Sequence, residues 1–195
     1  MSEPSLGPGV VWMLEQLWSP VVAVTAAYQG QANGLISSTA VTASLVPEAP
    51  RVAVQLARWN LTHRLVLGSG ALAVHLLAGE PDAALDRSLH LFAELGLRSG
   101  REAPKLTRTT TRPGVTGSPI LEDALAYVEG RVVQAFDGDE FTIVLADVAG
   151  GARLRAGAFM TIEHVRERLP PDQLEQWELR REQELREARR LRFGV

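Results

Sequence analysis

Short runs of apolar residues separated by turn residues dominate the chain from residue 21 onward. The first runs are VVAVTAA, NGLISSTAV and RVAVQLA, divided by a Gln29-Gly30 turn and a break at Pro47 and Pro50. ALAVHLL at 71–77 follows, and ALAYVEGRVVQAF and EFTIVLADV then lie on either side of an Asp137-Gly138 turn, before a last run, GARLRAGAFMTI. β-branched runs broken by Gly and Pro at this spacing are typical of antiparallel strands. The pattern predicts a mainly β fold of six to eight strands.

Fewer segments have helical spacing. VVWMLEQLW at 10–18 and the segment 62–67 predict two short helices. After Pro81, apolar residues recur at helical intervals and Gly96 follows the last of them, which predicts the longest helix of the first hundred residues. Residues 98–119 are polar and rich in Gly, Pro and Thr, and a loop of that length is usually functional or partly disordered.

The composition changes again after Pro170. Residues 170–195 contain six acidic residues and six arginines, with Leu174, Trp177 and Leu185 at roughly helical intervals. We expect an amphipathic helix that packs on a neighbouring subunit. The chain therefore divides into a domain of residues 1–169 and a helical extension of residues 170–195.

Composition and charge exclude several classes of function. The 195 residues are 46% hydrophobic and contain no cysteine, which excludes disulfides, thiolate nucleophiles and iron–sulfur ligation. The net charge is −3 and the basic residues are not gathered on one element, which argues against a nucleic-acid partner. No segment approaches ~20 uninterrupted apolar residues, so we expect no membrane span and a cytoplasmic protein.

Two segments carry candidate chemistry. Hydroxyl residues are frequent between Asn33 and Ser44, where they could hold a phosphate or the polar edge of a flat ligand, or could equally cap turns. In the segment RWNLTH at 58–63, Asn60 or Thr62 could cap a helix whose N-terminus would attract an anion. The four histidines lack metal-ligand spacing, and the chain has no G-x-S-x-G, Walker or Rossmann motif.

Taken in order, six segments make the chain resemble the flavin reductase-like, FMN-binding split-barrel family, near its flavoredoxin-like branch. Together they span about 120 residues, in the order and spacing of the family. The segments are VVAVTA at 21–26, NGLISSTAVTASLVP at 33–47, NLTHRLVLGSGALAVHLL at 60–77, SGREAPKL at 99–106, TGSPILEDALAYVEG at 116–130 and DGDEF at 137–141.

The resemblance implies a homodimer of six-stranded Greek-key split barrels with a few flanking helices and a C-terminal helix. It also implies a flavin, FMN with FAD possible, near the subunit interface. The residues that match flavin contacts of the family are Asn33, Gly34, Leu35, Ile36, Ser38 and Thr39 along the isoalloxazine ring, Gln55, Leu56, Ala57, Asn60 and Thr62 around the ribityl chain and phosphate, and Arg87 and Lys105 as basic positions.

Two positions depart from the pattern of the family. Glu140 stands where many of its reductases have a histidine associated with the nicotinamide end of NAD(P)H, and a carboxylate disfavours a polyanion nearby. His75 stands where relatives usually have asparagine, whose hydrogen bond an imidazole can replace.

The resemblance thus implies an FMN-binding flavoprotein. It would act as a flavin reductase-like oxidoreductase, with NAD(P)H or another electron donor, or as a flavoredoxin-type electron carrier with a redox partner protein. The alternative is a flavin-binding carrier or sensor without NAD(P)H turnover. A structural dimer that has lost flavin is a third reading.

Overall fold

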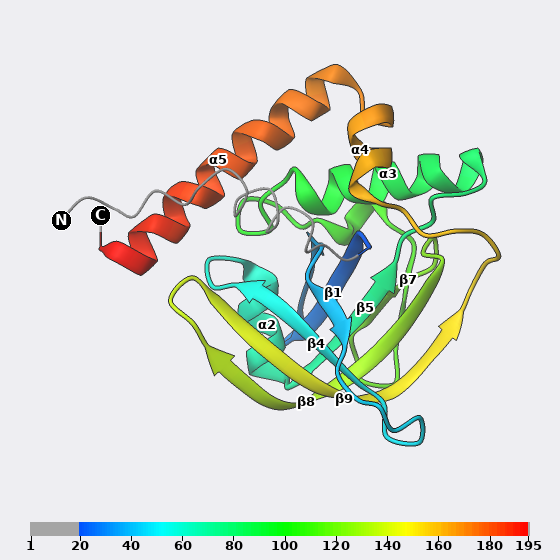
Figure 1. The fold of residues 1–195 in the computed structure, drawn as a ribbon, viewed down its shortest axis with the longest axis vertical. Coiled ribbons are helices and arrows are strands. Elements are labelled where there is room, and N and C mark those ends of the chain that lie inside the picture. Colours follow the sequence, from blue (N-terminus) through cyan, green and yellow to red (C-terminus); the bar gives the residue numbers. More distant parts are fainter. Residues whose placement is uncertain (1–19, 195) are drawn as a thin grey trace.

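The computed structural model describes residues 20–194, and its main feature is a curled antiparallel sheet of seven strands (Figure 1). The strand order is β2-β1-β5-β8-β9-β4-β3, and β6 and β7 form a separate pair. The strands are β1 (Val22–Tyr28), β2 (Gln31–Ser37), β3 (Ala40–Thr42), β4 (Arg51–Ala57), β5 (Ala71–Leu76), β6 (Thr111–Pro113), β7 (Pro119–Leu121), β8 (Ala126–Asp137) and β9 (Phe141–Arg153). The helices are α2 (Leu61–Ser69), α3 (Asp82–Gly96), η1 (Leu106–Arg108), α4 (Ile162–Arg168) and α5 (Pro171–Phe193).

Tight turns set the register of the hairpins. Gln29 and Gly30 have φ angles of 49° and 76°, the left-handed pair that a two-residue hairpin needs to match the twist of its strands. The long hairpin of β8 and β9 has two register shifts, which increase the local twist and bend. The sheet therefore curls into a half-barrel, while β2 and β3 at its two ends are not paired with each other.

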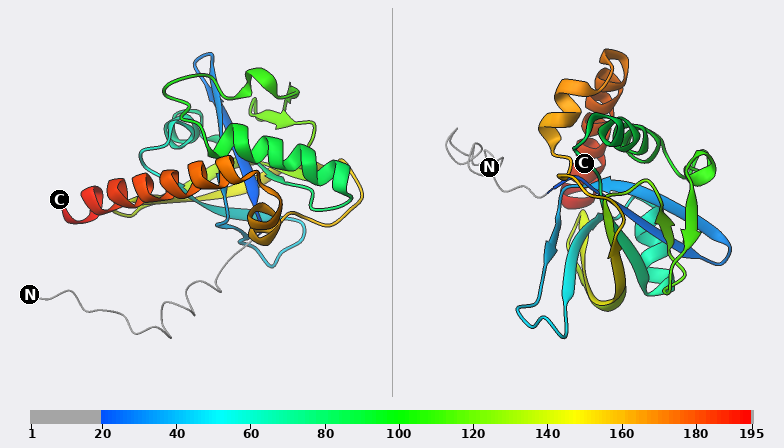
Figure 2. Two further views of the ribbon diagram at one scale, coloured as in Figure 1. Left: turned by 90° about the horizontal axis from the view of Figure 1, so that it is seen from above. Right: turned by 90° about the vertical axis from the view of Figure 1, so that its right-hand side faces the viewer.

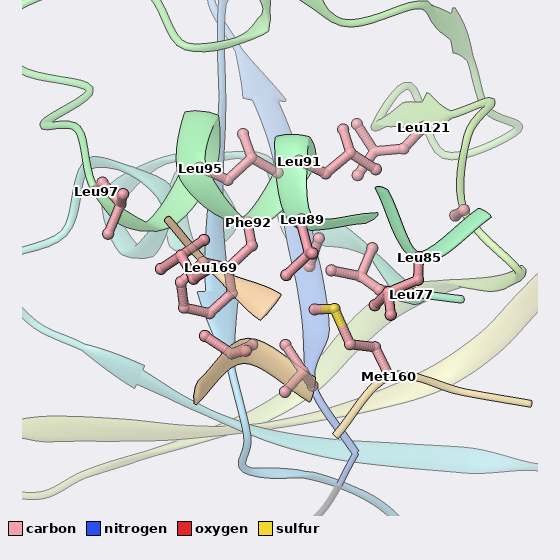
Figure 3. Packing of buried hydrophobic residues seen from close by; sticks show 14 residues of the cluster. Leu77, Leu85, Leu89, Leu91, Phe92, Leu95, Leu97, Leu121, Met160 and Leu169 are labelled. Carbon is pink, nitrogen blue, oxygen red and sulfur yellow. The ribbon is translucent and has the colours of Figure 1, made fainter. Parts of the chain in front are cut away.

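The hydrophobic core lies on both faces of the sheet. Inside the curl, α2 contributes Leu61, Leu65 and Val66 to a cluster with β1, β4, β5 and β9. Outside it, α3, α4 and the start of α5 pack against β1 and the segments beside it (Figures 1 and 2). Figure 3 shows Leu89, Phe92 and Leu95 of α3 in this outer cluster together with Leu169. The outer helices thus cover the face of the half-barrel that α2 does not fill.

The predicted elements agree with the structure in kind and differ in detail. The mainly β class, the Gln29-Gly30 and Asp137-Gly138 turns and the helices of α2, α3 and α5 are confirmed. The main sheet has seven strands where six were expected, because residues 40–42 add the short strand β3 beside β4. Residues 151–162 do not form a separate strand: the first three end β9. The helix expected at residues 10–18 lies outside the described residues.

Helix α5 packs in part on its own chain, and its packing on a neighbouring subunit stays a prediction. The ring centroids of Trp177 and Phe92 are 5.7 Å apart in an edge-to-face contact, and Gln176 Nε2 donates to the Leu97 carbonyl. The first half of α5 therefore packs on α3 of the same chain, whereas Leu185 farther along remains exposed. The division of the chain at residues 169 and 170 stays a prediction. No described helix is long and apolar enough to cross a membrane.

Candidate functional site

The candidate segments meet where β2, α2 and the loop of residues 99–106 come together. Asn33 Nδ2, on β2, donates to Thr62 Oγ1, on α2, over 3.0 Å, and both side chains are buried. Asn33 Oδ1 is also buried and has no hydrogen-bond partner among residues 20–194. A Cβ atom added at Gly100 would lie 2.3 Å from this oxygen, so the loop needs a glycine there to pass so close to Asn33. Three segments far apart in the sequence thus form one junction.

Lys105 is buried at the same junction. Its Nζ donates to the carbonyls of Gly34, 3.2 Å away, and Leu95, 2.6 Å away, and so ties β2 to the end of α3. Burial, and then the nearby charge of Arg180, lower the pKa of Lys105 to about 8. The lysine is therefore not a solvated loop residue. Two of its three donors bind protein carbonyls, so it acts on the site chiefly by holding β2 in place.

The hydroxyl row joins the end of β2 to β4 at the surface. Ser37 Oγ lies 2.8 Å from Thr39 Oγ1, and Thr39 Oγ1 donates to the carbonyl of Gln55 over 3.4 Å. The side chains of Ser38, Thr39 and Gln55 are exposed. Gly34 has no side chain and those of Leu35, Leu56 and Ala57 are buried, so these positions could meet a ligand only through their backbone. Ile36 and Asn60 are half-buried.

Arg87 is separated from the other candidate residues. Its guanidinium Nε lies 3.4 Å from a carboxylate oxygen of Asp123, and Arg87 lies in the first half of α3, whereas Leu95 lies at its end. Eight residues of helix, about 12 Å of rise, separate Arg87 from Leu95, which contacts Lys105. The structure therefore brings the candidates on β2, β4, α2 and the loop into one region and leaves Arg87 outside it.

A hydrogen-bonded chain beside the junction was not singled out from the sequence. His63 Nε2 lies 2.8 Å from Thr142 Oγ1, and this hydroxyl donates to Asp137 Oδ1 over 2.8 Å. Since the only proton of Thr142 goes to Asp137, His63 Nε2 is the donor in the first bond. Burial, and then the charge of Arg58, lower the pKa of His63. His63 thus has a fixed orientation at the start of α2.

Glu140 is not free to repel a ligand as the sequence suggested. Its Oε1 lies 3.3 Å from Arg192 Nη1, near the end of α5. The Glu140 carbonyl accepts a hydrogen bond from the backbone N–H of Arg58. The β8–β9 turn is thereby linked both to α5 and to the segment before α2. No local motif in the sequence could reveal this pairing, because the two charged residues are 52 positions apart.

Two hollows of about 520 Å³ lie at the half-barrel. One is lined by the β1–β2 turn, Leu61 and residues 100–104, 106 and 107, next to the buried junction. The other is mainly apolar and opens beside β3, with side chains of β1, β4, β5 and β8 on its walls. Both have room for a ring-sized ligand or for side chains of another molecule. Among residues 20–194, no cluster of His, Asp and Glu could hold a metal ion.

Comparison with known proteins supports a single family. Residues 14–168 match the family model described as "Flavin reductase like domain". The chain is 29% identical over 139 residues to the high molecular weight rubredoxin of Moorella thermoacetica, covering 71% of this chain and 57% of the relative. It thus spans little more than half the length of that protein.

Solved structures share the fold at low sequence identity. The flavoredoxin of Methanosarcina acetivorans superposes with a TM-score of 0.60 at 14% identity, covering 78% of this chain and 74% of that one. An FMN-binding protein from Thermus thermophilus gives 0.62 at 20% identity, covering 79% and 80%. At such identities the likeness shows the fold alone.

Proposed function

The chain belongs to the flavin reductase-like domain family, and we propose that it binds FMN where β2, the β4–α2 segment and the loop of residues 99–106 meet. The observation that carries the proposal is the buried junction of Asn33, Thr62, Gly100 and Lys105. It joins three of the six segments that resemble the family. An FMN-binding protein of the same fold supports FMN as the flavin.

The residues at the junction suit a flavin. Asn33 Oδ1 is a buried acceptor without a partner among the described residues, and exposed hydroxyls and backbone follow it along β2. We propose that Asn33 to Ile36, with Ser38 and Thr39, lie along the isoalloxazine ring. Gln55 to Ala57, with Asn60 and Thr62, would hold the ribityl chain and the phosphate. Lys105 stays in the proposed site because it holds β2 in place. Arg87 stays in it as well, as the candidate residue that lies apart from the junction.

A bound flavin would supply one- and two-electron redox chemistry, and the protein would supply orientation and electrostatics. Lys105 holds an ammonium group behind β2, and His63 holds a proton on Nε2 at the start of α2. We propose a flavin reductase-like oxidoreductase or a flavoredoxin-type electron carrier, located in the cytoplasm. The carrier reading agrees with the similarity to a rubredoxin, and the partner would then be another redox protein.

Flavin content and donor oxidation test this function. The purified protein should be yellow, with absorbance near ~450 nm typical of oxidised flavin, and denaturation should release FMN in a near-stoichiometric amount. A colourless protein that does not bind added FMN or FAD would contradict the proposal. Oxidation of NADH or NADPH, measured with and without added FMN, then separates a reductase from a carrier or sensor without turnover.

We also propose that the protein is a homodimer whose six longer strands in the main sheet form the six-stranded core of the family barrel. The mainly apolar hollow beside β3, with exposed Val41, Leu45 and Val46 near it, leaves hydrophobic surface that a second copy would cover. Light scattering at micromolar concentration should give twice the mass of the 195-residue chain. A flavin-loaded monomer would contradict this.

Thr62→Ala should weaken FMN binding more than riboflavin binding. Thr62 lies in the first turn of α2, where a phosphate is favoured, and a lost hydrogen bond to a charged group costs about 1.5 to 3 kcal/mol. Riboflavin lacks the phosphate and should lose less. Quenching of flavin fluorescence gives both dissociation constants, with Thr111→Ala, an exposed threonine on β6, as the matched control. Equal losses for the two flavins would assign Thr62 only to the support of Asn33.

A further inference from the structure

A cavity lies between helix α5 and the segment that joins β4 to α2. Helix α5 begins after residue 168, where the match to the family ends, and it passes over this segment (Figure 1). The cavity measures about 300 Å³. It is lined by Trp59, Arg180, Gln183, Glu184, Arg186 and Glu187. One wall thus belongs to the matched domain, and the other is an addition that the family match does not cover.

Two buried donors on the walls of this cavity lack acceptors. The indole Nε1 of Trp59 and the guanidinium Nε of Arg180 have no hydrogen-bond partner among residues 20–194. Buried donors in folded proteins are nearly always paired. Trp59 is held in place, since its ring lies 5.9 Å from that of Phe141 and its carbonyl accepts from Arg101 Nε. An acceptor on a ligand would satisfy both walls of the cavity at once.

The charges around the cavity favour an anion. Arg180 and Arg186 line it, but Arg186 Nη1 lies 3.9 Å from Glu182 Oε2 on the same helix and is already paired. The buried Lys105 lies close enough for its charge and that of Arg180 to affect each other. Of the two acidic groups, Glu187 accepts hydrogen bonds of 3.0 and 2.9 Å from Arg190 and is already neutralised. Glu184 Oε1 lies 3.8 Å from Arg180 Nε, beyond hydrogen-bond distance, and burial raises its pKa. With these pairs set aside, the positive charges of Arg180 and Lys105 face the single carboxylate of Glu184.

We propose that this cavity binds a phosphate group, and that Trp59 and Arg180 donate hydrogen bonds to it. The inference rests on the proposed function, because we assign the group to the phosphate of FMN. Trp59 directly precedes Asn60, the N-cap of α2, whose side chain makes no capping hydrogen bond. The helix N-terminus adjoining Trp59 adds a further favourable field for an anion. Helix α5 would thus complete the flavin site of its own chain.

The fixed position of α5 supports this role. Near its start, Trp177 packs against Phe92, and near its end Arg192 pairs with Glu140 on the β8–β9 turn. The helix is therefore held on both sides of the cavity, and Arg180 lies between the two attachments. A donor on a helix anchored in this way is preorganised for its ligand, which reduces the entropic cost of binding.

The test compares FMN with riboflavin, using the full-length protein. Arg180→Gln should weaken FMN binding roughly ten- to a hundredfold, as expected for one hydrogen bond to a charged group, and should leave riboflavin binding nearly unchanged. Trp59→Phe keeps an aromatic ring against Phe141 and removes the indole donor, so it should also weaken FMN selectively. Arg189→Gln, on the same helix but not among the residues that line the cavity, is the matched control and should bind FMN normally.

Glu184→Gln separates a phosphate site from a purely structural ion pair. If the cavity holds a phosphate, removal of the neighbouring carboxylate should tighten FMN binding several-fold, because a repulsive charge is lost. If Arg180 only supports α5 through Glu184, this variant should weaken FMN or leave it unchanged, and the inference would be wrong. Equal losses of FMN and riboflavin in Arg180→Gln would also overturn it.

Failure of the inference is distinguishable from failure of the proposed function. If FMN binds tightly and Arg180→Gln has no effect, only the assignment of the cavity is wrong. If NADP⁺ binding weakens and FMN binding does not, the phosphate belongs to a dinucleotide, and the assignment to FMN is wrong. If no flavin binds, the proposed function fails. Inorganic phosphate then still tests the cavity, because it should raise the melting temperature of the unmodified protein and not that of Arg180→Gln.

Discussion

Replacing Phe92 by alanine is expected to lower the free energy of unfolding by about 3 to 5 kcal/mol. The side chain is 1% exposed and lies in the outer cluster, in which α3, α4 and the start of α5 meet (Figure 3). Its truncation removes the contact with the ring of Trp177 and leaves a cavity that the packed helices can fill only in part. Urea unfolding followed by circular dichroism measures the loss.

Phe136→Ala is the matched control for this prediction. Phe136 lies on β8 with half of its surface exposed, so its truncation should cost less than about 1 kcal/mol. The double variant of Phe92 and Trp177 should cost less than the sum of the two single variants, by the ~0.5 to 1.5 kcal/mol typical of an aromatic pair. Additive losses would show that α5 is not anchored through this contact.

Much of the fold follows from patterns within single segments. Alternating β-branched runs and glycine-containing turns are local signals, and β1, β2, β4, β5, β8 and β9 were predicted from them. Strand β3 was missed because its three residues are too few to show an alternating pattern, although it pairs with β4, the next strand along the chain. The environment of α5 could not be predicted, because helical spacing indicates an apolar face and does not identify its partner.

The sequence located the segments of the candidate site, but not the contacts between them. Resemblance located the segments around Asn33, Thr62 and Lys105, and the structure places these residues together. It could not show that Lys105 binds two protein carbonyls, since that role depends on burial between β2 and α3. Arg180 carries no sequence signal, because it is one of six arginines in a charged helix. Its proximity to Trp59 arises only from the path of α5 over the domain.

His75 is expected to make stability depend on pH in the mildly acidic range. It is fully buried on β5, where Nδ1 lies 3.2 Å from the Ala23 carbonyl and Nε2 accepts the backbone N–H of Leu121 over 3.1 Å. With one nitrogen as donor and the other as acceptor, the imidazole is neutral in the folded protein. Burial lowers the pKa of His75 to about 4, against 6.5 for the free side chain.

The direction of the effect follows from proton binding. Between pH 6.5 and pH 4 the unfolded chain binds a proton at His75 and the folded protein does not, so acidification favours unfolding. The contribution of neutral His75 to the free energy of unfolding is complete above pH 6.5, decreases as the pH falls, and is lost by pH 4. A difference of this size between the two pKa values corresponds to about 3 kcal/mol. Urea unfolding at several pH values from 7 to 4 measures it.

His75→Asn should remove most of this pH dependence. An amide can accept from Leu121 N–H and donate to the Ala23 carbonyl, but it does not titrate, so the variant should approach or exceed the stability of the unmodified protein near pH 4. The lowered pKa of His63 acts in the same direction as that of His75, and the raised pKa of Glu184 acts in the opposite one. The difference between the two proteins therefore isolates His75.

The matched control is His90→Asn, which replaces an exposed histidine on α3. This variant should keep the pH dependence of stability of the unmodified protein. If His75→Asn keeps it as well, His75 is not the group that links protonation to unfolding.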